Sequence, residues 1–257
     1  MPHPTRHPTS RLPPRPARGN ALRVLLGWVG WTLLALAALQ LSFALRVASL
    51  IWSEAPSTAL QRSEAWRLWR AGELGRWRHE GVPAAALGAQ LPRAVIAAED
   101  AGFVDHFGVD WDAIRQAWAR LQRPRSGNTG HVRPARLVGG STITQQLAKN
   151  LLLSGERTFA RKGQELLIAW MLEALLDKRR ILVVYLNSVE WGDGIFGAEA
   201  AARHYVRKPA ARLTAAEAAR LAVLLPAPKR YGRRPDSAWV QARAQTILAR
   251  MPAVRLP

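Results

Sequence analysis

The most prominent feature of the hydrophobic pattern is an unbroken apolar segment near the N-terminus. Residues 24–45 form 22 successive positions without a charged side chain, and Leu, Ala, Val and Trp dominate them. About 20 apolar residues suffice to cross a hydrocarbon core, whereas the apolar region of a cleavable signal peptide covers only about 7–15 residues. Trp28 and Trp31 are typical of a membrane interface. The segment predicts a retained transmembrane helix.

Beyond this segment, apolar residues recur mainly with the period of a helix, and strand signals are sparse. The sequence therefore predicts a mainly α fold. Thr214 and Glu217 have the spacing of a capping box, so Glu217 is expected to be structural. Residues 63–77 are amphipathic and predict either an interfacial helix or a packed helix beside the membrane. The other expected helices cover residues 91–99, 112–121, 142–152, 159–176 and 214–225.

Charge and composition set the expected organisation. The chain has 257 residues, enough for one main domain, and carries 37 Lys and Arg against 18 Asp and Glu, a net charge of +19. Five of these charges are Arg residues ahead of the apolar segment, which favours a cytoplasmic N-terminus and export of the remainder. The expected parts are a basic tail (1–23), a transmembrane helix (24–45) and an exported domain (46–257). In a bacterium, that domain faces the periplasm from the inner membrane.

Two aspects of composition exclude classes of function. The chain has no Cys, which excludes disulfides, Cys-ligated zinc, iron–sulfur clusters and thiol nucleophiles. Residues 46–257 keep a net charge of +14 after the five tail charges are subtracted, which favours anionic partners. Nucleic acid is not expected as a partner outside the cytoplasm. Residues 123–140 are rich in Gly and Pro and predict a mobile loop over a site.

The first group of residues with potential chemistry lies at the end of the helix expected at 91–99. Glu99 and Asp100 are followed by Phe103, His106 and Gly108. A carboxylate at the edge of an apolar wall has its pKa raised by desolvation, as a general base or acid working near neutral pH requires. Glu99 is the candidate base. The alternative is that Glu99 and Asp100 are ordinary surface acids and His106 a turn residue.

Two further groups follow. Residues 140–150 are dense in hydroxyl and amide side chains, and Ser141, Gln145 and Lys149 are spaced to share one helix face able to bind phosphate and sugar oxygens. The alternative is a polar helix facing the core. Arg157, Arg161 and Lys162 precede Glu165 around the start of the next helix. Cations there oppose the helix dipole, so they are either solvated or held by an anion such as a diphosphate.

Two other patterns suggest ligands that we do not expect. Residues 192–197 match the dinucleotide pattern G-x-G-x-x-G, but residues 187–191 intervene where a strand should lead directly into the glycines. Asp110 and Asp112 resemble a D-x-D metal site, but Asp112 is well placed to cap the next helix.

Together, these segments resemble the peptidoglycan glycosyltransferase family, the glycan-polymerising module of class A penicillin-binding proteins and of monofunctional transglycosylases. The likeness covers about residues 91–231. The sequence EDxxFxxHxG from Glu99 is similar to the first motif of the family, GSTITQQLxKN from Gly140 to the second, and RKxxE from Arg161 to the third. Neither Ser-x-x-Lys nor Lys-Thr-Gly occurs, so the chain resembles the monofunctional form without transpeptidase activity.

The resemblance implies a lysozyme-like helical domain with a membrane-dipping jaw. It also implies polymerisation of lipid II into β-1,4-linked glycan strands by an inverting reaction that releases undecaprenyl diphosphate. Glu99 and Glu165 would be the two catalytic residues, both carrying a carboxylate. No cofactor is required, although Glu165 could orient a divalent cation such as Mg²⁺ or Mn²⁺. The implied substrate-binding residues are Asp100, Phe103, His106, Ser141, Thr142, Gln145, Gln146, Lys149, Asn150, Arg157, Arg161 and Lys162.

The expected partners are lipid II, the growing glycan chain and the inner membrane, with cell-wall synthesis or division proteins as further candidates. Two alternatives stay open at this stage. A membrane-bound lytic transglycosylase or muramidase would share a catalytic glutamate and a helical fold, but would need no diphosphate-binding cations. A membrane-tethered cell-wall scaffold would have no catalysis.

Overall fold

The computed structural model describes residues 18–54, 57–122, 141–156 and 158–257. It separates into two units, residues 1–43 and residues 44–257, which we treat one at a time. Most of the basic tail, the Gly- and Pro-rich segment 123–140 and Arg157 lie outside the described residues.

The first unit consists of most of helix α1 (Arg18–Ser49). Within α1, the 28-residue stretch Leu22–Ser49 is long and apolar enough to cross a membrane. The side chains of residues 22–39 are all exposed, with Trp28 70% and Trp31 71% exposed. Such exposure of large apolar groups along a helix suits contact with lipid. The predicted apolar helix is confirmed and extends a few residues beyond 24–45 at both ends.

The second unit is mainly α, as predicted, and the helices expected at 91–99, 112–121, 142–152, 159–176 and 214–225 are present within about three residues of their expected bounds. The helix expected at 63–77 instead covers Ala59–Arg70, so the second half of that segment is not part of it. Four helices without a prediction complete it, namely α7, α8, α10 and α11. The helices are α2 (Ala59–Arg70), α3 (Gln90–Glu99), α4 (Trp111–Gln122), α5 (Ile143–Leu152), α6 (Phe159–Leu175), α7 (Lys178–Ser188), α8 (Ala198–Val206), α9 (Ala215–Ala222), α10 (Pro228–Tyr231) and α11 (Ala238–Arg250). Short 3-10 turns occur at Leu74–Arg76, Ala84–Ala86, Ala210–Arg212 and Met251–Ala253.

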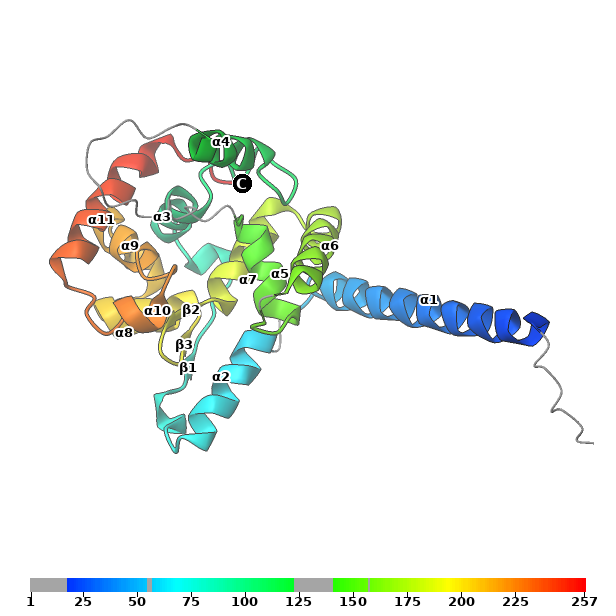
Figure 1. Cartoon of the computed structure of the whole chain (residues 1–257). Helices are drawn as coiled ribbons and strands as arrows, with labels where there is room; N and C mark the ends of the chain where they lie inside the picture. The colour runs from blue at the N-terminus through cyan, green and yellow to red at the C-terminus, as the bar shows by residue number, and fades with distance from the viewer. Residues whose placement is uncertain (1–17, 55–56, 123–140, 157) are drawn as a thin grey trace, which may run out of the picture. The chain divides into compact units, whose positions relative to one another are not determined.

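Two groups of helices build the core of this unit (Figure 1). Helix α3 packs against α9 and α11, while α5 packs against α6, α7 and α2. The apolar stripe of α3 includes Leu91 and Val95, and that of α5 includes Ile143 and Leu147, all fully buried. Because Glu99 ends α3 and Gln146 lies on α5, the meeting of these two groups brings the first two motifs together.

Residues 192–197, which match the dinucleotide pattern, form part of a small β-sheet. Strand β3 (Ile195–Phe196) pairs in parallel with β1 (Arg78–His79) and antiparallel with β2 (Glu190–Gly192). The glycines therefore shape a hairpin rather than a strand-to-helix turn. Gly197 has φ 88°, and a Cβ there would lie 2.3 Å from the Glu80 carbonyl oxygen. The rejection of a dinucleotide site is consistent with this geometry.

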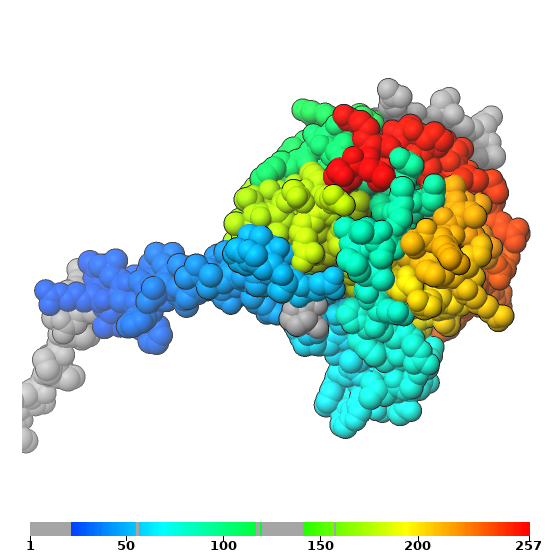
Figure 2. All heavy atoms as spheres, turned by 180° about the vertical axis from the view of Figure 1, so that it is seen from behind, coloured from blue at the N-terminus to red at the C-terminus, as the bar shows by residue number. Residues whose placement is uncertain are grey.

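The two ends of the second unit are both packed. Val47 and Leu50 are buried, and Arg180 of α7 donates to the carbonyl oxygens of Leu50 and Ser53 at 2.7 Å. At the other end, Leu256 and Pro257 line a cavity of about 250 Å³ with residues of the 84–92 segment. Figure 2 shows the C-terminal residues lying beside that segment.

Candidate active site

Glu99 is the last residue of α3, and its carboxylate points toward α5. Its Oε2 accepts a hydrogen bond from Gln146 Nε2 at 2.8 Å. Burial raises the pKa of Glu99, and the charge of Asp100 adds to the rise, while Gln146, Arg243 and Lys149 act in the opposite direction. A carboxylate whose pKa is raised in this way is suited to accept a proton near neutral pH.

Asp100 joins the end of α3 to the start of α5. It caps α3, and its Oδ2 accepts the backbone N–H of Ile143 at 2.9 Å. Its Oδ1 contacts His106 Nε2 at 2.9 Å. Asp100 is only 7% exposed. Asp100 therefore ties His106 and the start of α5 to the end of α3, and that Asp100 and His106 bind substrate stays a prediction.

The N-terminus of α5 is held by a capping box that the sequence analysis did not identify. Thr142 accepts the N–H of Gln145 at 3.2 Å, and the Gln145 side chain accepts the N–H of Thr142 at 3.3 Å. Thr142 also donates to the Gly108 carbonyl at 2.7 Å. Both side chains are buried, and that they bind sugar or phosphate stays a prediction. Their hydrogen bonds are used to start the helix.

The polar face of α5 differs from the predicted one. Gln146 is half-buried and Lys149 is exposed, so these two residues, three positions apart, face the site in place of Gln145. Asn150 is 5% exposed because it falls on the buried stripe with Ile143 and Leu147. Asn150 therefore faces the core, and its role as a substrate ligand stays a prediction.

The cations of the third motif gather around Glu165 on α6. Arg161 Nη1 donates to Glu165 Oε2 at 2.7 Å, and Lys162 Nζ donates to Glu165 Oε1. Lys162 also lies 3.4 Å from Ser141 Oγ. Glu165 is 3% exposed, and Arg161 Nε is buried with no partner among the described residues. Arg157 was predicted to belong to this group and lies outside the described residues.

Lys149 connects the base to the cation cluster. Desolvation lowers the pKa of Lys149, Arg161 and Lys162 lower it further, and Glu165 and Glu99 oppose them. The charges of Glu99 and of the third-motif residues therefore all act on Lys149. These residues come from three helices: Glu99 from α3, Lys149 from α5, and Arg161 and Lys162 from α6.

Phe103, which we predicted to bind substrate, is fully buried, with Lys178 Nζ 4.6 Å from its ring centroid. Lys178 also bonds Glu173, which accepts from Thr144 of α5. Phe103 therefore packs the loop after Glu99 onto this network, and its contact with substrate stays a prediction.

Two residues near Glu99 carried no role in the sequence analysis. Tyr185 of α7 donates to Gln146 Oε1 at 2.9 Å, and Arg243 of α11 lowers the pKa of Glu99. Tyr185 begins the sequence Tyr-Leu-Asn within the region of the family resemblance, but the sequence does not show that Gln146 is its hydrogen-bond partner. Arg243 had no signal because α11 itself was not predicted.

The residues around Glu165 do not fit a resident divalent cation. Both carboxylate oxygens are bonded to Arg161 and Lys162, and Lys149 adds a third positive charge nearby. A second group of acids, Glu64, Glu190 and Asp193, brings carboxylate oxygens within 4.8 Å of one another. That group is also neutralised by cations. Its partners are Arg67, Arg76 and Lys229.

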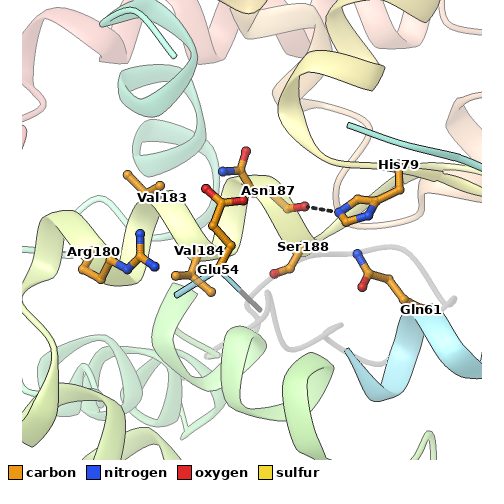
Figure 3. Close-up of a pocket in the computed structure, with 8 residues that line it drawn as sticks. All are labelled: Glu54, Gln61, His79, Arg180, Val183, Val184, Asn187 and Ser188. Carbon is orange, nitrogen blue, oxygen red and sulfur yellow. Dashed lines mark hydrogen bonds between the residues drawn. The ribbon is translucent and has the colours of Figure 1, made fainter. Parts of the chain in front are cut away.

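Figure 3 shows a small pocket on another face of α7. Its walls are Arg180, Val183, Val184, Asn187 and Ser188 of α7, with Glu54, Gln61 and His79. The cavity of about 20 Å³ has room for one water molecule. Gln61 Nε2 is buried without a partner among the described residues, and a water would satisfy it. Because none of the lining residues belongs to the group around Glu99, Lys149 and Glu165, the pocket is separate from that group.

Comparison with known proteins agrees with this geometry. The transglycosylase family model matches residues 70–252. A biosynthetic peptidoglycan transglycosylase of Burkholderia thailandensis is 49% identical over 220 residues, which cover 86% of this chain and 82% of the relative. One from Burkholderia pseudomallei is 49% identical over 222 residues, with the same coverage. One from Bordetella pertussis is 48% identical over 201 residues, covering 78% of this chain and 81% of the relative.

Proposed function

Because the chain belongs to the transglycosylase family and is a peptidoglycan glycosyltransferase, we propose that it polymerises lipid II into β-1,4-linked glycan strands with Glu99 as the general base. Lipid II and the growing glycan chain are the substrates that the family implies. The observation that carries the proposal is the buried Glu99 carboxylate bonded to Gln146 of α5. It is supported by Lys149 of the same helix, on which the charges of Glu99 and of the third motif both act.

The reaction needs a base on one side of an anomeric carbon and positive charge on the other. Glu99 accepts the proton of the GlcNAc 4-hydroxyl of the incoming lipid II, and that oxygen attacks C1 of the terminal MurNAc of the growing chain. The C1–phosphate oxygen bond breaks with inversion, and undecaprenyl diphosphate leaves. Lys149, Arg161 and Lys162 neutralise the departing diphosphate, with Arg157 as a further candidate.

Glu165 organises the cations in this proposal. Because it is buried and accepts from both Arg161 and Lys162, it fixes these two side chains in place before substrate arrives. Preorganised charge stabilises a leaving group without reorganisation during the reaction. The role of Glu165 is therefore positional, and the three cations contact the diphosphate.

The orientation in the membrane is a second part of the proposal. The five Arg residues ahead of the apolar segment 24–45 favour a cytoplasmic N-terminus, a single crossing of the bacterial inner membrane and a periplasmic catalytic domain. This orientation presents the site on the face of the membrane where glycan is assembled. A substrate anchored to lipid also requires an enzyme held at the bilayer surface.

The test is incubation of labelled lipid II with the full-length protein and separation of the products by gel electrophoresis. We expect polymer from the wild type, none from Glu99→Gln, and a loss of at least about 100-fold from Lys149→Ala, because each removes a charge used in the transition state. Arg212→Ala, on a 3-10 turn outside the site, is the control and should retain activity.

The same assay separates the two alternative functions. A lytic transglycosylase or muramidase would release fragments from added glycan, and Lys149→Ala would leave that activity intact. A scaffold would bind lipid II without forming polymer, and Glu99→Gln would behave as the wild type. Polymer from Glu99→Gln at the wild-type rate would refute the role of Glu99. The names of the curated relatives favour synthesis over cleavage.

A further inference from the structure

A chain of two hydrogen bonds runs from the core to the candidate base. Tyr185 of α7 donates its hydroxyl proton to Gln146 Oε1 at 2.9 Å, and Gln146 Nε2 donates to Glu99 Oε2 at 2.8 Å. The three residues come from three different helices, α7, α5 and α3. Tyr185 therefore reaches Glu99 only through the amide of Gln146.

The chemistry of the groups fixes the direction of both bonds. An ionised carboxylate can only accept, so Gln146 must turn its N–H group toward Glu99 and its oxygen toward Tyr185. Tyr185 is fully buried, and burial raises the pKa of its phenol well above the usual value. The phenol thus stays protonated and supplies the donor that the amide oxygen needs.

We propose that Tyr185 is a positioning residue for glycosyl transfer, which holds the Gln146 amide in the orientation that fixes the Glu99 carboxylate. The inference rests on the proposed function, in which Glu99 is the base. The hydrogen bond from Gln146 engages Oε2 of Glu99. Because the carboxylate is held by that atom, Oε1 is left to take the proton of the sugar hydroxyl.

The expected consequence of losing Tyr185 follows from the groups that face Glu99. Burial and Asp100 raise the pKa of Glu99, whereas the bond from Gln146 lowers it, followed by Arg243 on α11 and Lys149 on α5. Without the Tyr185 hydroxyl, Gln146 loses the partner of its oxygen and its bond to Glu99 weakens. The pKa of Glu99 should then rise, and the base should be protonated at a higher pH.

The experiment is a pH profile of lipid II polymerisation by full-length Tyr185→Phe. We expect kcat to fall about tenfold with KM little changed, and the acid limb of kcat/KM to move to higher pH. Tyr205→Phe is the matched control, since the Tyr205 hydroxyl also lies in a largely buried site and donates to the Trp191 carbonyl at 3.2 Å. It should leave the acid limb in place.

A double-mutant cycle tests whether Tyr185 acts through Gln146. Gln146→Met should shift the acid limb in the same direction, and Tyr185→Phe should add no further shift or loss in that background. Additive effects, or a Tyr185→Phe protein that loses stability while its acid limb stays fixed, would overturn the inference. If Tyr185→Phe does not fold, an unshifted limb in Gln146→Met overturns it equally.

The outcome is separable from failure of the proposed function. If Glu99→Gln abolishes polymer but Tyr185→Phe leaves the acid limb unmoved, only the role of Tyr185 is lost. If Glu99→Gln polymerises normally, the assignment of the base fails, and the role of Tyr185 fails with it.

Discussion

Glu190 on β2 is a buried acid with several charged groups around it. Its Oε1 is 3.9 Å from Lys229 of α10 and accepts the Gly194 N–H at 3.4 Å, with Glu64 and Asp193 nearby. Burial raises the pKa of Glu190 to about 7, and the two acids add to the rise while Lys229 opposes it. The carboxyl group is therefore half-protonated near neutral pH.

This raised pKa predicts a pH-dependent stability. The folded protein holds the Glu190 proton more tightly than the unfolded chain, so the contribution is complete below pH 4.5 and is lost as pH rises to about 7. Glu190→Gln cannot ionise, so it should be more stable than the wild type at pH 8, by at most on the order of 2–3 kcal/mol, and show no gain at pH 4. Urea unfolding at both pH values measures this. Equal differences at the two pH values would contradict it.

At the scale of an element, the start of α5 sets the position of Gln146 and Lys149. Thr142→Ala removes the cap of α5, and Thr214→Ala removes the corresponding cap of α9, where Glu217 completes the capping box. Each change should cost about 1 kcal/mol of unfolding free energy. Only Thr142→Ala should also lower the rate of lipid II polymerisation, because α9 carries none of the proposed cations or the base.

The comparison is made by thermal unfolding together with the polymer assay. Thr142→Ser, which keeps the hydroxyl, should restore both stability and rate. If the two Ala variants lost activity in proportion to their stability alone, the position of α5 would not matter for catalysis.

The same helix shows what a sequence can and cannot predict. Its bounds follow from apolar periodicity, and its chemistry was visible as a dense run of polar residues. The sequence did not show which residues of that run cap the helix and which face the site, because Thr142 and Gln145 look like ligands until their reciprocal hydrogen bonds are seen. Phe103 and Asn150 were assigned to substrate through the family resemblance, which does not report that both side chains are buried. Tyr185 and Arg243 approach Glu99 from helices far along the chain, and no local pattern reports such a contact.

At the scale of the whole molecule, the chain combines a membrane helix with a basic catalytic unit. The net charge of +19 and the apolar stretch Leu22–Ser49 both favour residence at an anionic bilayer. The compact second unit begins at Ala44, close to the predicted boundary at residue 46. Val47 and Leu50 are buried within it, so the residues that follow the apolar segment are part of the fold and not a free linker.

This packing predicts different outcomes for two truncations. A chain of residues 44–257 should keep the unfolding midpoint of the full domain, yet no longer sediment with vesicles of neutral lipid. A chain of residues 57–257 lacks Val47 and Leu50, and Arg180 loses its acceptors on Leu50 and Ser53. It should be less stable than the 44–257 chain by on the order of 3–6 kcal/mol, from about 1.5–3 kcal/mol for each of the two buried side chains. Denaturant unfolding of both chains measures the difference. Equal midpoints would show that residues 44–56 only join the anchor to an independent domain.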